Sequence, residues 1–188
     1  DQALVLHMEA LGPEHPRVAN ALRIMGGILH EAGDFQLARH YCERALAILE
    51  KSLGSEHPDT ASTYNDLGTV SYEMDDAVQA KSYFEQALAI RSRVLGSEHP
   101  ATATSLSNLG GILYNDEDYE GARTYWEKAL AIRAKVYGLE HRDVANSLNN
   151  LGYLRIQMGD LEGAQELLEQ ALAVRDRALG RDHPDVAQ

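Results

Sequence analysis

The sequence predicts an all-α fold, a right-handed superhelical solenoid of stacked antiparallel helix pairs, and three observations support this prediction. Residues recur at an interval of 42, each interval reads as two amphipathic helices joined by a tight turn, and no strand-like alternation appears. The recurrence is clearest in two series: Gly12, Gly54, Gly96, Gly138 and Gly180, and His15, His57, His99, His141 and His183.

The interval divides the 188 residues into a single array of about four and a half repeats. Four full repeats cover residues 13–54, 55–96, 97–138 and 139–180, and partial repeats cover 1–12 and 181–188. Solenoids normally close with atypical polar repeats, and neither end of this sequence carries one. We therefore expect the sequence to be an excerpt from a longer array.

The first helix of each repeat is expected to begin after the phrase Leu-Gly-x-Glu-His-Pro. In the second repeat Pro58 suits the first helical position, where a missing N–H costs nothing, and His57 lies near the N-cap. This helix should run to about Met74. Asp76 then caps the second helix, and Gly96 ends it by adopting the left-handed conformation.

Small residues predict a close approach between the two helices of a repeat. In the third repeat Gly110 and Ala122 carry almost no side chain, and Trp126 adds a large apolar group from the second helix. A single helix pair cannot bury both of its surfaces, so neighbouring pairs should share a continuous core.

These residues resemble the tetratricopeptide repeat signature over essentially the whole chain. The residues that match it in the third repeat are Leu106, Leu109, Gly110, Leu113, Ala122, Trp126 and Ala129, with Leu113 where the family favours tyrosine. The period and the phrase from Val144 to Gly152 are similar to the kinesin-light-chain subclass, which also occurs in sensor arrays of signalling ATPases. Ala77 and Arg142 depart from the pattern, where an aromatic residue and a proline are usual. The resemblance implies a non-catalytic scaffold whose first helices line a concave, ligand-binding groove.

The polar face of the first helices, which we call the first-helix stripe, is the candidate ligand surface. All seven asparagines of the chain lie on it, although asparagine is unfavourable inside a helix because its side chain competes for backbone groups. The candidate groove residues are Asn20, Arg23, His30, Asn65, Tyr72, Ser107, Asn108, Tyr114, Asn146, Asn149, Asn150 and Tyr153.

Two interpretations of the stripe remain open. The amides could present donors and acceptors to the backbone of an extended peptide, with Tyr72, Tyr114 and Tyr153 contacting its side chains. Alternatively, the amides could bond across neighbouring first helices, as a ladder between repeats that stiffens the array. Both can hold at once.

The charges of the stripe slightly restrict the expected chemistry of the ligand. Arg23 stands against Glu31, Asp66 and Glu73, which favours a peptide with neutral or basic side chains. The carboxylate clamp of the family has no matching basic set here, so the resemblance does not imply that activity.

The histidine series is better interpreted as capping or turn residues than as a metal site. Stacked helices lie about 10 Å apart, whereas Zn–N bonds measure about 2 Å, so neighbouring copies cannot share an ion. Cys42 falls in the column of Phe84 and Trp126, which predicts a buried thiol.

Two series of cations stand near the ends of the second helices, where positive charge suits the helix dipole. We expect these cations to form a solvated ladder, that is, a row of solvent-exposed side chains with a structural role that pair with nearby acids. The alternative is that they form a second docking edge for a partner domain. The cations are Arg91, Arg133 and Arg175 in one series and Lys51, Arg93, Lys135 and Arg177 in the other, with Glu56, Glu98, Glu140 and Asp182 as partners.

Composition excludes several classes of protein. A net charge of −12 and a pI near 5.0 argue against nucleic-acid and membrane partners, because phosphate binding needs clustered Lys or Arg. One cysteine permits no internal disulfide, and no apolar stretch is long enough for a membrane helix, so the cytoplasm is expected. Phosphate-binding, metalloprotease and serine-hydrolase motifs are missing, so we expect no enzyme activity and no cofactor.

The sequence therefore predicts a non-catalytic scaffold that binds a peptide or protein segment, or other domains of the same longer chain, in the groove. The alternative is the sensor or autoinhibitory arm of a multidomain signalling ATPase or protease. Single-stranded RNA binding is disfavoured by the negative charge and by the period.

Overall fold

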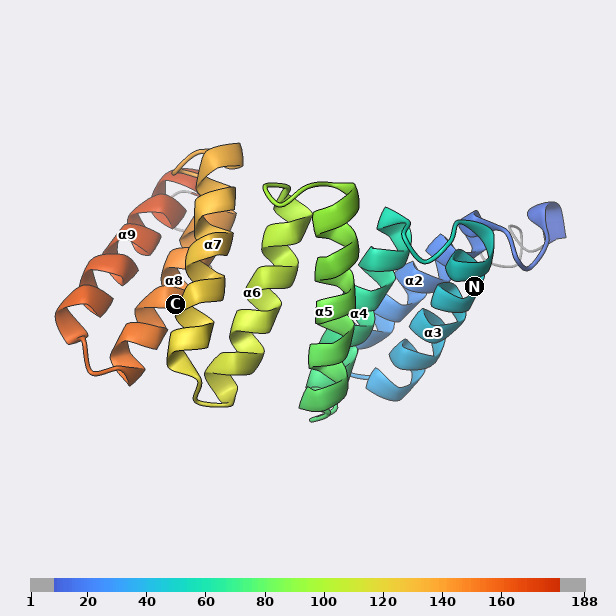
Figure 1. The fold of residues 1–188 in the computed structure, drawn as a ribbon, viewed down its shortest axis with the longest axis horizontal. Coiled ribbons are helices and arrows are strands. Elements are labelled where there is room, and N and C mark those ends of the chain that lie inside the picture. Colours follow the sequence, from blue (N-terminus) through green and yellow to red (C-terminus); the bar gives the residue numbers. More distant parts are fainter. Residues whose placement is uncertain (1–8, 180–188) are drawn as a thin grey trace. The chain divides into compact units, whose positions relative to one another are not determined.

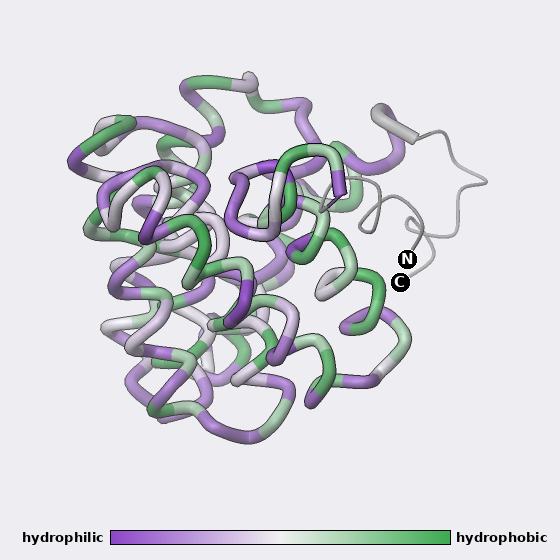
Figure 2. The backbone as a smooth tube through the Cα atoms, turned by 90° about the vertical axis from the view of Figure 1, so that its right-hand side faces the viewer, coloured by the Kyte–Doolittle hydropathy of each residue, from purple (hydrophilic) through white to green (hydrophobic). Residues whose placement is uncertain are grey.

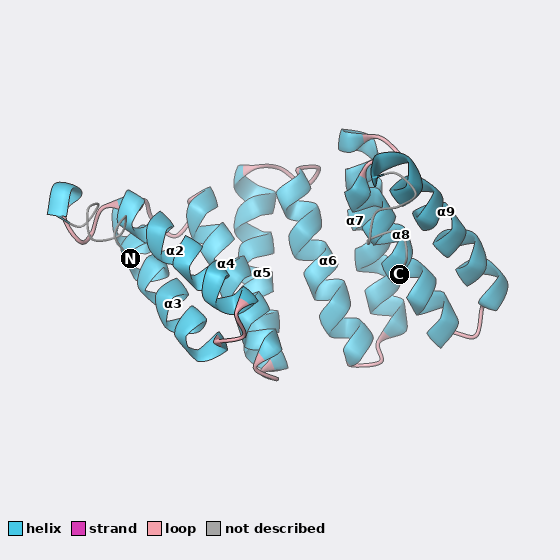
Figure 3. Cartoon of the chain, turned by 180° about the vertical axis from the view of Figure 1, so that it is seen from behind, coloured by secondary structure: helices cyan, strands magenta, loops and turns pink. Residues whose placement is uncertain are grey.

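The computed structural model describes residues 9–179, which form helices joined by turns, with no strand among them (Figures 1 and 3). The chain divides into two compact units, Asp1–Ser97 and Glu98–Gln188. The partial repeats predicted for 1–12 and 181–188 lie outside the described residues, apart from residues 9–12.

The N-terminal unit contains two helix pairs. Helix α2 (Pro16–Glu31) packs on α3 (Phe35–Ser52), and α4 (Pro58–Glu73) packs on α5 (Ala77–Val94). Both α2 and α3 also contact α4, so the second pair stacks on the first.

The C-terminal unit repeats this arrangement. Helix α6 (Pro100–Asn115) packs on α7 (Tyr119–Tyr137), α8 (Arg142–Gln157) packs on α9 (Leu161–Leu179), and α7 contacts α8. The predicted all-α fold of stacked helix pairs is confirmed within each unit. No helix among residues 9–179 is long and apolar enough to cross a membrane.

The recurring histidines cap the first helices, as predicted. The Nδ1 atom of His57 accepts from the backbone N–H of Asp59 at 3.1 Å, which satisfies one of the N–H groups that the first turn leaves unpaired. The same bond recurs at the starts of α2, α6 and α8, including α8, which begins with Arg142 in place of proline.

The second helices begin at aspartate caps and end near glycine. Asp76 Oδ1 accepts from the N–H of Gln79 at 3.0 Å, as the sequence predicts. Gly96 has a φ of +97°, the left-handed conformation that lets the chain leave α5 without steric strain.

Neighbouring repeats share a core within each unit. Leu46 of α3 packs against the buried cluster of α4 and α5 that includes Tyr64, and Leu130 of α7 packs against the cluster of α8 and α9 that includes Leu148. Hydrophobic and hydrophilic stretches accordingly alternate along the helices (Figure 2).

One glycine in each first helix faces a larger residue of the second helix. A Cβ added to Gly110 would lie 2.5 Å from the Trp126 ring, far inside van der Waals contact. The corresponding pairs are Gly26 with Cys42, Gly68 with Phe84 and Gly152 with Leu168, with Cβ distances of 2.6, 2.6 and 2.8 Å. The prediction of close approach at these positions is confirmed.

Two neighbouring glycines of α6 provide a matched test of this contact. Gly110→Ala should lower the free energy of unfolding by about 1–3 kcal/mol, because the methyl group overpacks the Trp126 contact. Gly111→Ala should raise it by about 0.5–1 kcal/mol, because nothing lies within 4 Å and alanine is the better helix former. Urea unfolding followed by circular dichroism measures both, and equal effects of the two substitutions would contradict the interpretation.

Candidate interaction surface

In the N-terminal unit, two of the predicted groove residues belong to a polar network between helices. Arg23 Nη1 of α2 donates to Asp66 Oδ2 of α4 at 2.9 Å. Arg91 Nη1 of α5 donates to the amide oxygen of Asn65 at 3.1 Å, and Arg91 is only 6% exposed. Arg23 thus ties neighbouring first helices together, whereas Asn65 is bonded to the second helix of its own repeat.

The charges of this network compensate one another. Partial burial raises the pKa of the Asp66 carboxyl, and the positive charges of Arg23 and Arg91 oppose that rise. Burial likewise lowers the pKa of Arg91, and the charge of Asp66 opposes that change. Asp66 is thus engaged with Arg23, which weakens the sequence-based preference for a basic peptide in this unit.

The other candidate residues of the N-terminal unit lie in different surroundings. The His30 ring packs 5.6 Å from the ring of Phe35, and its Nε2 atom is buried without a hydrogen-bond partner. Asn20 is exposed on α2, and Tyr72 of α4 is 38% exposed. Asn20 and Tyr72 are therefore the more accessible stripe residues in this unit.

In the third repeat the predicted stripe merges with the core. The Tyr114 ring lies 5.5 Å from Trp126 and 5.9 Å from Tyr119, so it is half-buried in an aromatic cluster. The backbone carbonyl of Ser107 accepts from Trp126 Nε1 at 2.8 Å, and Asn108 is half-buried. The sequence predicts a ligand contact for Tyr114, whereas the structure places most of its ring against other aromatic residues.

The fourth repeat brings Asn149 and Tyr153 together in a pocket of about 540 Å³ between α8 and α9, which we call the α8/α9 pocket. Arg175 of α9 completes its polar side, and Asn150 is half-buried next to it in the sequence. Asn146 accepts a bond from Arg175 Nη2 at 3.4 Å.

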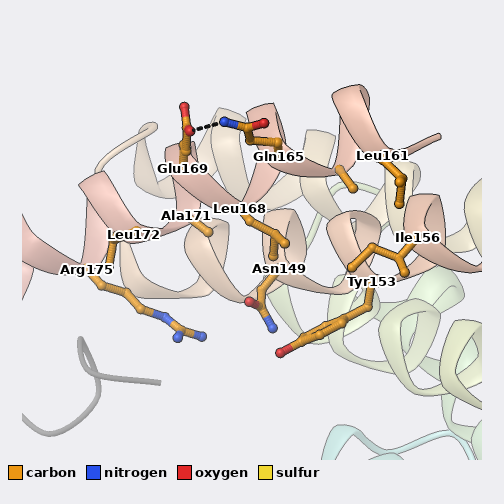
Figure 4. Close-up of a pocket in the computed structure, with 11 residues that line it drawn as sticks. Asn149, Tyr153, Ile156, Leu161, Gln165, Leu168, Glu169, Ala171, Leu172 and Arg175 are labelled. Carbon is orange, nitrogen blue, oxygen red and sulfur yellow. Dashed lines mark hydrogen bonds between the residues drawn. The ribbon is translucent and has the colours of Figure 1, made fainter.

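Figure 4 shows how these side chains are arranged. The guanidinium of Arg175, the amide of Asn149 and the hydroxyl of Tyr153 lie along one side of the pocket. On the other side, a hydrogen bond of 2.8 Å joins Gln165 to Glu169 (Figure 4). The remaining lining is largely aliphatic: Ile156, Leu161, Ala164, Leu168, Ala171 and Leu172.

The arginine series of the second helices was interpreted wrongly from the sequence. A solvated ladder was expected, but Arg91 is buried against Asn65, and half-buried Arg133 donates to Ser147 Oγ of α8 at 2.7 Å. These arginines face the first helices and bind their polar side chains. The 42-residue spacing of the arginines was the available signal, but it does not show which side chains of the first helices they meet.

The second cation series is exposed and paired with acids, as expected, although Glu14, the partner of Lys51, was not among the predicted acids. Each cation pairs with a glutamate of the turn before the first helix, 37 residues earlier in the chain. The pairs are Lys51 with Glu14, Arg93 with Glu56, Lys135 with Glu98 and Arg177 with Glu140, at 2.5–2.6 Å. The predicted partner Asp182 lies outside the described residues. Residues 9–179 hold no group of three His, Cys, Asp or Glu side chains placed to bind a metal.

Two arginines of α5 give a matched test of the buried network. Arg91→Ala should lower the free energy of unfolding by about 2–3 kcal/mol, because a buried charged hydrogen bond and its packing are lost. Arg93→Ala, which removes an exposed ion pair with Glu56, should cost less than about 1 kcal/mol. Urea unfolding of the two variants measures the difference, and a cost for Arg91→Ala no larger than that for Arg93→Ala would contradict the network.

The buried thiol supplies a further test. Cys42 is 1% exposed, and burial, with a smaller contribution from the negative charge of Asp66, raises its pKa to about 12. The thiolate is the reactive form, so Ellman's reagent at pH 8 should label the native protein at least about a hundredfold more slowly than the urea-unfolded protein. Rapid labelling under native conditions would show that the thiol is accessible.

Comparisons with known proteins agree with the architecture of stacked helix pairs described above. The tetratricopeptide repeat profile matches residues 1–51, 17–92, 62–115, 105–177 and 143–188, while no curated protein matches the sequence. Among solved structures, BtubC (BKLC) from P. vanneervenii is similar with a TM-score of 0.82 and 24% identity, over 97% of this chain and 72% of that chain.

Two further structures share the fold. A kinesin-light-chain structure with nearly identical TPR-like repeats, from Podosopora anserina, has a TM-score of 0.74 and 28% identity, over 94% of this chain and 84% of that chain. A Rap protein complexed with Competence and Sporulation Factor has a TM-score of 0.72 and 19% identity, over 83% of this chain and 42% of that chain. Because the profile matches run from the first residue to the last, the protein belongs to the tetratricopeptide repeat family.

Proposed function

We propose that the protein is a non-catalytic interaction module that binds a peptide or protein segment on the first-helix stripe, with the α8/α9 pocket as the centre of the binding surface. The supporting observation is the meeting of Asn149, Tyr153 and Arg175 at one aliphatic pocket. The stripe residues of the N-terminal unit support binding less, because Arg23 and Asn65 are engaged between helices.

The chemistry of the pocket suits a polypeptide ligand. The Asn149 amide can donate to a backbone carbonyl and accept from a backbone N–H. Tyr153 is 50% exposed and offers both an apolar ring and a hydroxyl, and tyrosine and arginine are enriched among the residues that dominate binding energy at protein interfaces. The aliphatic lining would bury an apolar side chain of the ligand.

The fold neighbours give limited support. A Rap protein of similar fold was solved in complex with Competence and Sporulation Factor, so a related arrangement of helices can hold another molecule. At 19% identity this likeness shows the fold alone, and the ligand of the present protein is to be found by experiment.

A random-peptide display library provides the probe for this proposal. Peptides selected on the intact chain should bind the double variant Asn149→Ala/Tyr153→Ala at least about tenfold more weakly, measured by fluorescence anisotropy, because two central contacts are removed. Gln170→Ala, an exposed position of α9 that does not line the pocket, should leave the affinity unchanged. Undiminished affinity in the double variant, with native helicity, would exclude the α8/α9 pocket as the binding site.

A further inference from the structure

The fourth repeat differs from the other three repeats at two positions of the 42-residue period. The first position holds tyrosine in three repeats and leucine in the fourth: Tyr41, Tyr83, Tyr125 and Leu167. The second position holds Leu29, Ser71, Leu113 and then Arg155. One substitution shortens a side chain of α9, and the other replaces a small or apolar residue of α8 with a charged one.

In the N-terminal unit the corresponding tyrosine fills space between helices. Tyr83 of α5 and Leu46 of α3 pack against the same buried cluster. The Tyr83 ring lies 6.0 Å from the ring of Tyr64, which belongs to that cluster. Two phenol rings therefore occupy this region of the second repeat.

In the fourth repeat, which belongs to the C-terminal unit, leucine side chains stand at the positions of both rings. Leu148 stands at the position of Tyr64 and Leu167 at the position of Tyr83, and Leu167 packs with Leu130 against the equivalent cluster. Arg155 does not fill the space, because its guanidinium binds the carboxylate of Asp160 at the start of α9.

A cavity of about 350 Å³ lies between α7, α8 and α9 at this place, and we call it the α7–α9 cavity. Its apolar lining consists of Leu130, Leu151, Leu154, Met158 and Leu167. Leucine-lined cavities of about 150 Å³ bind benzene, so this cavity has room for one substituted aromatic ring.

The charged residues that line the cavity favour an uncharged occupant. Arg123 and Arg155 are balanced by Glu127 and Asp160, so the lining carries no net charge. Arg155 is paired with Asp160, and Arg123 is paired with Glu120 at 2.5 Å. Guanidinium groups beside an aromatic ring add a favourable cation–π attraction without requiring a charged ligand.

We propose that the α7–α9 cavity receives the phenol ring of a tyrosine from a partner protein. The chain itself indicates this occupant, since its second repeat places Tyr83 at the position that Leu167 has in the fourth. The α7–α9 cavity shares no lining residue with the α8/α9 pocket, so the proposal stands independently of the proposed function.

Two small probes test the proposal on the intact chain with labelled leucine methyl groups. The first probe is p-cresol, the tyrosine side chain alone, and the second is N-acetyltyrosine amide, which adds the flanking peptide groups. Both should shift the methyl resonances of Leu130, Leu151 and Leu167 saturably in NMR spectra, with a Kd on the order of 1 mM for a ligand of this size.

Substitutions that fill or close the cavity should remove this binding. Leu167→Tyr supplies the ring from within the chain and should weaken the binding of both probes at least about tenfold. Gln170→Tyr, which adds a tyrosine at an exposed position of α9 outside both the cavity and the α8/α9 pocket, should leave binding unchanged. Should Leu167→Tyr fail to fold, Met158→Trp provides the same test, because Met158 is 40% exposed and lines the cavity, so tryptophan there obstructs entry without altering the core.

Three outcomes would overturn the proposal. The wild-type methyl resonances could remain unshifted by either probe. The folded filling or closing variant could bind the probes as tightly as the wild type. Binding of p-cresol without binding of N-acetyltyrosine amide would reject a protein side chain as the occupant and indicate a small free aromatic compound instead.

Discussion

The close approach of the two helices in each repeat is the constraint on which the rest of the structure depends. Only glycine fits at position 110 of α6, because the indole of Trp126 occupies the volume that any side chain would need. That indole also donates to the carbonyl of Ser107, and it packs against the Tyr114 ring in a tilted arrangement. The same contact thus sets the spacing of the pair and the rotation of α6 about its axis, and this rotation decides which residues form the first-helix stripe.

Two asparagines of the stripe accept hydrogen bonds from arginines of the second helices. Asn65 meets the buried Arg91, and Asn146 meets Arg175. The first repeat has Leu49 at the position of Arg91, and this leucine is 2% exposed in an apolar cluster. In the second repeat a guanidinium thus replaces part of the apolar core and provides a hydrogen-bond partner for the Asn65 amide, which is otherwise unfavourable within a helix.

The sequence was sufficient for the fold because the fold is local and repeated. Each histidine cap, aspartate cap and glycine terminus depends on residues within one repeat, and each recurs in register, so a signal too weak to interpret once becomes clear when it occurs four times. The burial of Cys42 was predictable for the same reason, because its column also contains Phe84 and Trp126.

The candidate site was less predictable because it depends on contacts between helices. Helical periodicity assigns Tyr114 to the polar face, but the reach of Trp126 and Tyr119 from the second helix draws its ring into an aromatic cluster. Periodicity likewise assigns Arg91 to a helix end and cannot show that its long side chain extends to Asn65. The α7–α9 cavity is lined by residues of three helices, so it is apparent only when the neighbouring helices are in place.

The ion pairs that link each turn glutamate to the end of the second helix have a consequence for how such a chain can change in length. Each pair, such as Arg93 with Glu56, joins two residues of the same repeat and carries no net charge. Duplication or deletion of a 42-residue unit therefore adds or removes a complete pair and leaves no unmatched cation or acid at the junction. Gene segments that encode one whole repeat could therefore be gained or lost at any point of the array, and these ion pairs would impose no electrostatic penalty.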